Sequence, residues 1–147
     1  MPLEPDNAPK RFSIVQDIND SGNWLALYDD GIVGYWPKEL FTHLKDGATF
    51  VKYGGSAFES INKTRPAMGN GSFPSKIAEE YNKSAFFAHC QYSNAESEGV
   101  LVDISAPKVY PVTTFPLCYE TEYFLTLMPE LGQMFAYGGS GGDCRGM

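Results

Sequence analysis

The sequence has few positive charges and no basic run. Its 147 residues include 11 Lys and Arg against 18 Asp and Glu, which gives a formal net charge of −7 and a pI of about 4.7. Nucleic acids and anionic membranes attract clustered Lys and Arg, so neither is expected as a partner. No apolar stretch approaches the roughly 20 residues that a membrane-spanning helix needs, so no such helix is expected.

Histidine and cysteine are also scarce, with two His and three Cys. His43 and His89 have no carboxylate or cysteine at the spacing of a metal ligand, so we expect structural or exposed histidines, no metal site and no cofactor. Cys90 directly follows His89, but neighbours on a strand face opposite ways, which disfavours a Cys–His catalytic pair. We therefore expect Cys90 to be a buried thiol.

The first ten residues lack the apolar segment of a signal peptide. Residues 1–10 are acidic and Pro-rich, and we expect a flexible N-terminal arm followed by one β domain over 11–147. The sequence nevertheless has Asn-x-Ser/Thr glycosylation sequons, which support secretion only weakly. They are Asn19, Asn62, Asn70 and Asn82.

Short alternating segments dominate the chain, and hydrophobic residues make up 43% and aromatics 14% of it. Such a chain should fold around one core. Frequent turns and little helical periodicity predict an all-β, antiparallel fold, arranged as a sandwich or barrel. The predicted strands cover 11–17, 24–28, 32–36, 48–53, 84–92, 99–105, 119–127 and 133–137, with a short helical turn at 37–44 and a long loop at 62–76.

The 24–36 segment is predicted to be a hairpin. Trp24, Ala26 and Tyr28 alternate with leucines, and Asp30-Gly31 supplies the residues that a type I′ turn prefers. Tyr35 and Trp36 lie on the return strand. Because so many large aromatics gather here, we expect the hairpin to form the hydrophobic centre.

Several motifs of the chain resemble the neprosin domain of plant proteins, and the resemblance covers nearly the whole chain but only about the C-terminal half of that domain. They are G-N-W at 22–24, G-Y-W-P at 34–37, L-F-T-H-L at 40–44, Y-G-G at 53–55, M-G-N-G-S-F-P at 68–74, C-Y at 118–119 and Y-G-G at 137–139.

The resemblance implies a secreted antiparallel β-sandwich and, in active members, a glutamic endopeptidase that cleaves after proline. It also implies a disulfide between Cys118 and Cys144. Three unrelated reduced thiols in an intracellular protein remain the alternative.

In active members the resemblance places one catalytic glutamate in the half that is absent here and the second directly after Tyr-Gly-Gly. That second position is Ser56. A serine does not titrate near working pH and cannot replace a general acid or base. Glu59 is a substitute candidate, but its odd offset in a strand points it to the opposite face unless the glycines at 54–55 form a bulge. Other glutamates are expected to be surface charges: Glu39, Glu79 and Glu80.

Two functional hypotheses follow. The first is a non-catalytic neprosin-like remnant that serves as a binding module, with proline-rich peptides or proteins, or sugars, stacking on aromatic side chains. The second is part of an active secreted prolyl endopeptidase, whose catalytic acids come from an N-terminal half or from Glu59.

Overall fold

Short antiparallel strands account for most of the regular structure, and the helical elements are brief 3-10 turns. The structure is a computed structural model that describes residues 9–105, 108–125 and 128–144. It confirms the predicted all-β antiparallel class; the packing of two sheets as a sandwich stays a prediction. Most of the predicted arm, residues 1–8, lies outside the described residues. The chain divides into two compact units, Met1–Val51 and Lys52–Met147, which are described separately.

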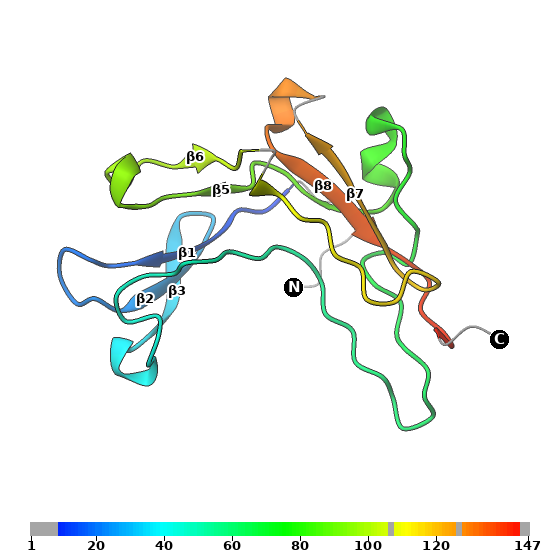
Figure 1. Cartoon of the computed structure of the whole chain (residues 1–147), viewed down its shortest axis with the longest axis horizontal. Coiled ribbons are helices and arrows are strands. Elements are labelled where there is room, and N and C mark those ends of the chain that lie inside the picture. The colour runs from blue at the N-terminus through cyan, green and yellow to red at the C-terminus, as the bar shows by residue number, and fades with distance from the viewer. Residues whose placement is uncertain (1–8, 106–107, 126–127, 145–147) are drawn as a thin grey trace. The chain divides into compact units, whose positions relative to one another are not determined.

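The first unit is a three-stranded sheet in the order β1-β2-β3 (Figure 1). Its strands are β1 (Phe12–Gln16), β2 (Trp24–Tyr28) and β3 (Gly31–Trp36), and a 3-10 turn, η1 (Lys38–Leu40), follows Pro37. The predicted hairpin is therefore present.

The turn of this hairpin lies one residue earlier than predicted. Tyr28 pairs with Gly31, so Asp29 and Asp30 are its central residues, with φ of 45° and 68°. Aspartate tolerates the left-handed region better than most residues do. Arg11, which precedes β1, supports the turn: its backbone N–H donates to the Asp29 carboxylate at 3.0 Å, and its guanidinium binds the Asp30 carboxylate at 2.9 and 3.0 Å.

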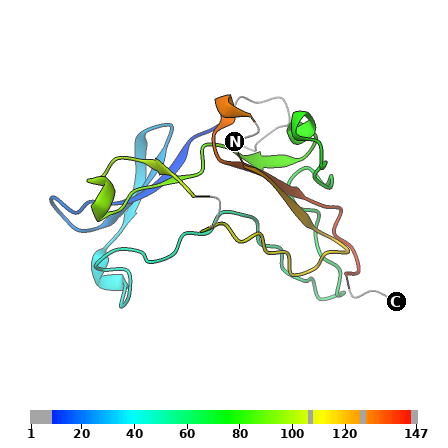
Figure 2. The same ribbon diagram turned by 45° about the horizontal axis from the view of Figure 1, so that its top comes forward.

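The second unit contains a three-stranded sheet in the order β4-β8-β7 and a two-stranded sheet of β5 and β6 (Figure 2). The strands are β4 (Ala85–Phe87), β5 (Gln91–Tyr92), β6 (Val102–Asp103), β7 (Glu120–Leu125) and β8 (Met134–Gly138). The 3-10 turns are η2 (Ala78–Lys83), η3 (Ala95–Ser97) and η5 (Pro129–Leu131).

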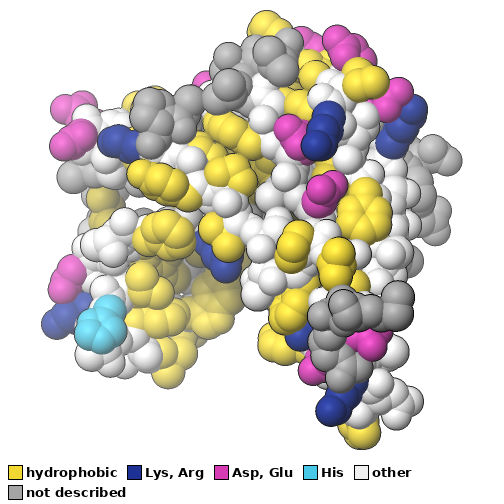
Figure 3. Space-filling view, turned by 45° about the vertical axis from the view of Figure 1, so that its right-hand side comes forward, with side chains coloured by type: hydrophobic (Ala, Val, Ile, Leu, Met, Phe, Trp, Pro, Cys, Tyr) yellow, Lys and Arg dark blue, Asp and Glu magenta, His cyan; other side chains and the backbone are white. Residues whose placement is uncertain are grey.

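The best-buried side chains lie in the second unit, so the prediction of a hydrophobic centre in the 24–36 hairpin was wrong. Met134 and Ala136 of β8 are 0% exposed, and Phe124 of β7 packs with them. By contrast, Tyr35 is 62% and Trp36 42% exposed. Hydrophobic side chains accordingly form much of the surface seen in Figure 3.

Three predicted strands also differ, and one of them, 99–105, is limited to the two residues of β6. Residues 48–53 form no strand, and the predicted 84–92 strand is interrupted between β4 and β5. His89, at the interruption, has φ of 51°, and the chain there bonds to a loop instead: the N–H groups of His89 and Cys90 donate to the carbonyls of Leu131 and Gln133. The predicted 119–127 strand runs to Leu125, and its last two positions lie outside the described residues.

In the part of the chain that the structure describes, no helix is both long enough and apolar enough to cross a membrane.

Candidate functional site

One face of the β4-β8-β7 sheet carries a group of aromatic rings. Phe135 and Tyr137 are two residues apart on β8 and so project from the same face. Phe87 on β4 pairs with Phe135, which brings its ring to 5.2 Å from Phe135 and 5.4 Å from Tyr137, both stacked. All three are half-buried. We call these rings, with Tyr53, the aromatic face.

Tyr53 is fixed at one side of this face. Its ring lies 6.2 Å from that of Phe87 in an edge-on arrangement, and its hydroxyl donates to the Gln91 carbonyl at 2.5 Å. Burial, with a smaller contribution from Cys90, raises the pKa of Tyr53 above its ordinary value. Burial likewise raises the pKa of Tyr137. Both phenols are therefore neutral at physiological pH and offer apolar ring surface with a polar tip.

Residues 54–69 leave this face as a long arm that runs out and back (Figure 1). Its turn is closed by Ser60 and Thr64, whose hydroxyls lie 2.9 Å apart and whose backbones bond at 2.8 Å. Ile61 at the turn is 100% exposed and Phe58 is 83% exposed. Within the described residues the arm belongs to no strand and is held only at its base.

The base of the arm is paired with the residues that follow β8. Arg65 and Gly142 exchange both backbone hydrogen bonds, at 3.0 and 2.9 Å, and the Met68 N–H donates to Gly139 at 2.9 Å. The Tyr119 hydroxyl donates to the Pro66 carbonyl at 2.7 Å. These contacts set the position of the arm relative to the sheet.

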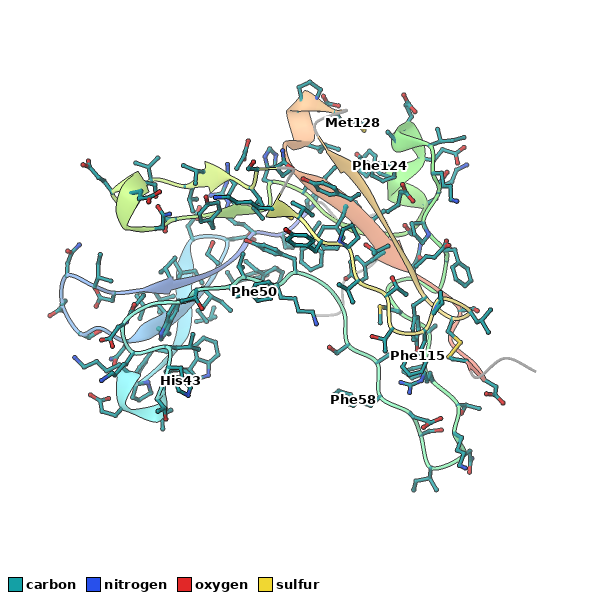
Figure 4. All side chains as sticks on the ribbon, viewed as in Figure 1. His43, Phe50, Phe58, Phe115, Phe124 and Met128 are labelled. Carbon is teal, nitrogen blue, oxygen red and sulfur yellow. A yellow bond between two sulfur atoms is a disulfide. The ribbon has the colours of Figure 1, made fainter. Side chains whose placement is uncertain are left out.

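The predicted disulfide between Cys118 and Cys144 is present and supports the same base. Both cysteines are buried with Tyr119 in a small cluster, against which Ala57 and Met68 of the arm pack together with Phe115. The bond is drawn in yellow in Figure 4. The structure therefore contradicts the alternative of three reduced thiols.

Three of the four glycines of the two Tyr-Gly-Gly motifs, Gly55, Gly138 and Gly139, lie where an added Cβ would come within 3.0 Å of another atom. A Cβ at Gly139 (φ 146°) would lie 2.0 Å from the Cys118 carbonyl oxygen. A Cβ at Gly55 would lie 2.9 Å from the Met68 sulfur and 3.2 Å from the Tyr137 ring. The backbone at Gly55 thus rests directly against the aromatic face, and the next residue is Ser56.

Ser56 and Glu59, the predicted catalytic positions, are both exposed on the arm. Since residues 54–60 form no strand, the expectation that these two side chains occupy opposite strand faces does not apply. Glu59 takes part in none of the ion pairs found among the described residues, which involve Asp29, Asp30, Asp46 and Glu80.

The carboxyl groups with a clearly shifted pKa are all shifted downward. Hydrogen bonds from Ser21 lower the pKa of Asp17, and the backbone N–H of Arg11 lowers that of Asp29. Hydrogen bonds from Lys83 and Ser75 lower the pKa of Glu80. A carboxyl that donates a proton near neutral pH needs the opposite shift, so these three have the character of charged surface groups.

The histidines and the remaining cysteine offer no reactive group for catalysis. His43 and His89 are exposed. Cys90 is free and buried, and burial raises the pKa of its thiol to about 11. That is the environment of an inert thiol rather than a nucleophile, as predicted. No three His, Cys, Asp or Glu residues of the described chain gather where they could hold a metal ion.

The four sequon asparagines are exposed. The Asn70 side chain is engaged: its amide donates to the Lys83 carbonyl at 2.9 Å, and its oxygen accepts from the Ser72 N–H at 3.0 Å. Asn62 lies in the turn of the arm. Glycosylation of any of the four stays a prediction.

The first unit has an open hollow with a volume of about 730 Å³. Lys38 and Lys45 contribute positive charge to its lining, and Glu39 and Asp46 oppose it. Because these charges balance, the hollow favours neither anions nor cations, and the aromatic face is the better candidate site.

The chain matches the family described as Neprosin over residues 4–140, so it belongs to the neprosin family. This confirms the resemblance on which the motif analysis rests. No solved structure matches the chain at a significant level. In the sequence analysis, Tyr53 and Tyr137 were noted only as parts of the two Tyr-Gly-Gly motifs. Their grouping with Phe87 and Phe135 was missed. The alternation in 133–137 was the available signal, because it indicated that Phe135 and Tyr137 share a face.

Proposed function

We propose that this neprosin-family chain binds proline-containing peptide segments on its aromatic face and does not cleave them. The observation that carries the proposal is the stacked group of Phe87, Phe135 and Tyr137 beside Gly55. Proline-rich segments dock on aromatic surfaces because their extended conformation costs little further entropy on binding. Half-buried rings that are held by their neighbours provide such a surface.

Ser56 supports the absence of cleavage. It takes the position that the resemblance gives to a catalytic glutamate, and its exposed hydroxyl does not ionise near neutral pH and so cannot replace that general acid or base. The disulfide supports a setting outside the cytosol, because such bonds persist in oxidising compartments. We therefore propose a secreted binding protein built on the peptidase-like domain.

Binding is tested by titrating the protein with a peptide of alternating proline and glutamine in a calorimeter. Phe135→Ala should weaken binding by roughly five- to tenfold, which corresponds to about 1 kcal/mol of ring contact. Tyr35→Ala is the matched control, because Tyr35 is an exposed aromatic in the first unit. A peptide with alanine in place of proline should bind more weakly. Equal binding of both peptides would overturn the proposal.

Cleavage is tested by incubating the same peptide with the chain at acidic and neutral pH and measuring products by mass spectrometry. We expect no product, and none for Ser56→Glu alone, because a lone carboxylate lacks its partner in acid–base catalysis. Product that disappears with Glu59→Gln would favour the alternative of an active peptidase that uses Glu59. Ser56→Glu in a chain completed with a family N-terminal half tests the other alternative, in which that half supplies the missing acid.

A further inference from the structure

The side chain of Arg65 is held by two independent contacts at the base of the arm. Its guanidinium carbon lies 3.8 Å from the centre of the Phe115 ring, and its Nη1 donates to the Ala57 carbonyl at 3.1 Å. In Figure 4, Phe115 lies beside the returning part of the arm and Phe58 lies on the outgoing part. Because the backbone of Arg65 is also paired with Gly142, the group is oriented before any ligand arrives.

The Arg65 guanidinium forms no ion pair within the described residues. The ion pairs found there have other cations: Lys10, Arg11, Lys45 and Lys83. An arginine side chain has five N–H donors, and the side-chain hydrogen bond found here, to Ala57, occupies one of them. A half-buried arginine that is stacked on a ring and bonded to a neutral carbonyl keeps its positive charge available.

The position of Arg65 relates it to the aromatic face. Its partner Ala57 is two residues beyond Gly55, and the Gly55 backbone lies against the Tyr137 ring. Two residues of chain span at most about 7 Å. The backbone contacts of the aromatic face and of the Arg65 side chain, at Gly55 and Ala57, are therefore close enough for a short peptide to reach both.

We propose that Arg65 binds a carboxylate of the peptide ligand, supplied by a C-terminus or by an acidic side chain. Arginine binds carboxylates through two parallel hydrogen bonds, and stacking on Phe115 presents the planar group in one orientation. This assignment rests on the proposed peptide-binding function and adds the charge requirement of the ligand. Proline-containing peptides with a free carboxylate near the last proline are the ligand class that it selects.

Three matched peptides test the assignment by calorimetric titration. All are acetylated chains of glutamine and proline that end in proline: one has a free C-terminal carboxylate, one a C-terminal amide, and one an amide plus a glutamate before the last proline. The free acid should bind roughly tenfold more tightly than the amide, as expected for hydrogen bonds to a charged group. Tighter binding of the glutamate peptide than of the simple amide identifies a side-chain source for the same carboxylate site.

Arg65→Gln should abolish the preference for the carboxylate and leave the affinity for the amide within about twofold, since only the charged contact is lost. Arg65→Lys keeps the charge without the planar group and should retain part of the preference. Lys63→Gln is the matched control, because it removes one positive charge from the same arm and should preserve the preference.

Equal affinity of wild-type protein for all three peptides would overturn the carboxylate site and leave the proposed function standing. Parallel loss of acid and amide binding in Arg65→Gln, with a normal circular dichroism spectrum, would overturn it in favour of a purely structural arginine. Failure of every peptide to bind wild-type protein would overturn the proposed function itself. If Arg65→Gln does not fold, the wild-type and Arg65→Lys titrations still decide the question.

Discussion

Burial controls the chemistry of Cys90. The thiol has no disulfide partner, and its pKa rises from 9.0 to about 11 because the interior disfavours the thiolate. At pH 8 the folded protein then holds about a hundredfold less thiolate than an exposed cysteine does, from the two-unit difference. Cys90 is therefore predicted to be unreactive in the native state.

Thiol titration with an aromatic disulfide reagent checks this prediction. The native protein should give almost no reaction, and the denatured, unreduced protein should give one thiol. Three thiols in protein purified under oxidising conditions would contradict the Cys118–Cys144 bond. The sign of the pH effect follows from the raised pKa: the contribution of Cys90 to stability is complete below about pH 9 and declines as pH rises toward 11.

Gly139 is predicted to tolerate no side chain. An alanine there would place Cβ 2.0 Å from the Cys118 oxygen at a φ of 146°, so the backbone has to move. We expect Gly139→Ala to lower the free energy of unfolding by about 3 kcal/mol or more. Gly34→Ala is the control, because its Cβ would meet no atom within 4 Å and a strand alanine is no less stable than glycine. Urea denaturation measures both, and similar losses would contradict this account of the motif.

At the scale of the element, the β2–β3 turn depends on residues that accept a positive φ. Asp30→Val should destabilise the hairpin by about 1–2 kcal/mol, since a β-branched residue is strained at φ of 68°. Asp30→Gly should change stability little, because the relief of strain offsets the loss of the exposed Arg11 ion pair. Thermal unfolding followed by tryptophan fluorescence is the measurement, because Trp24 and Trp36 flank this hairpin. Equal effects of the two substitutions would show that the left-handed conformation at residue 30 does not determine the stability of the hairpin.

Sequence patterns predicted most strands because local alternation and turn residues determine them. The same patterns failed where tertiary contacts determine the local conformation. The Asp30-Gly31 pair matched the turn rule, yet cross-strand pairing placed the turn at Asp29 and Asp30. The break at His89 has no glycine or proline to announce it and results from bonds to the loop before β8.

The candidate site was predictable only in part for the same reason. The motif located Tyr53 and Ser56, but Tyr53 and the two residues that flank Ser56 contact β4, β8 and Arg65, which are distant in sequence. The number of aromatic residues in the 24–36 segment does not indicate whether another element packs over them. That is why Met134 and Ala136, in an unremarkable strand, are the best-buried positions instead.

At the scale of the whole molecule, stability is predicted to be unequal between the two units. No described residue of Met1–Val51 is buried, whereas the second unit contains the cluster of Phe124, Met134 and Ala136 and the disulfide. Amide hydrogens exchange fastest where little apolar surface supports the hydrogen bonds. Peptides from β1 to β3 should therefore exchange with deuterium well before those from β8.

Hydrogen–deuterium exchange with mass spectrometry measures this difference directly. Reduction of the disulfide provides a second arm of the experiment: exchange in β7 and β8 should accelerate, and exchange in β1 to β3 should change little. Slower exchange in the first unit than in β8 would contradict the assignment of the core.

The bond between Cys118 and Cys144 also governs what a break in the backbone would do. Its sequence separation is 26, and the enclosed segment contains β7, η5 and β8. A nick within η5, between Pro129 and Glu130, would leave two fragments that remain covalently joined and still paired through β7 and β8. Such a nicked molecule would keep the size of the intact chain until it was reduced, with only one added water in its mass. A non-reducing gel would therefore not reveal the cut, and a reducing gel would separate the two fragments.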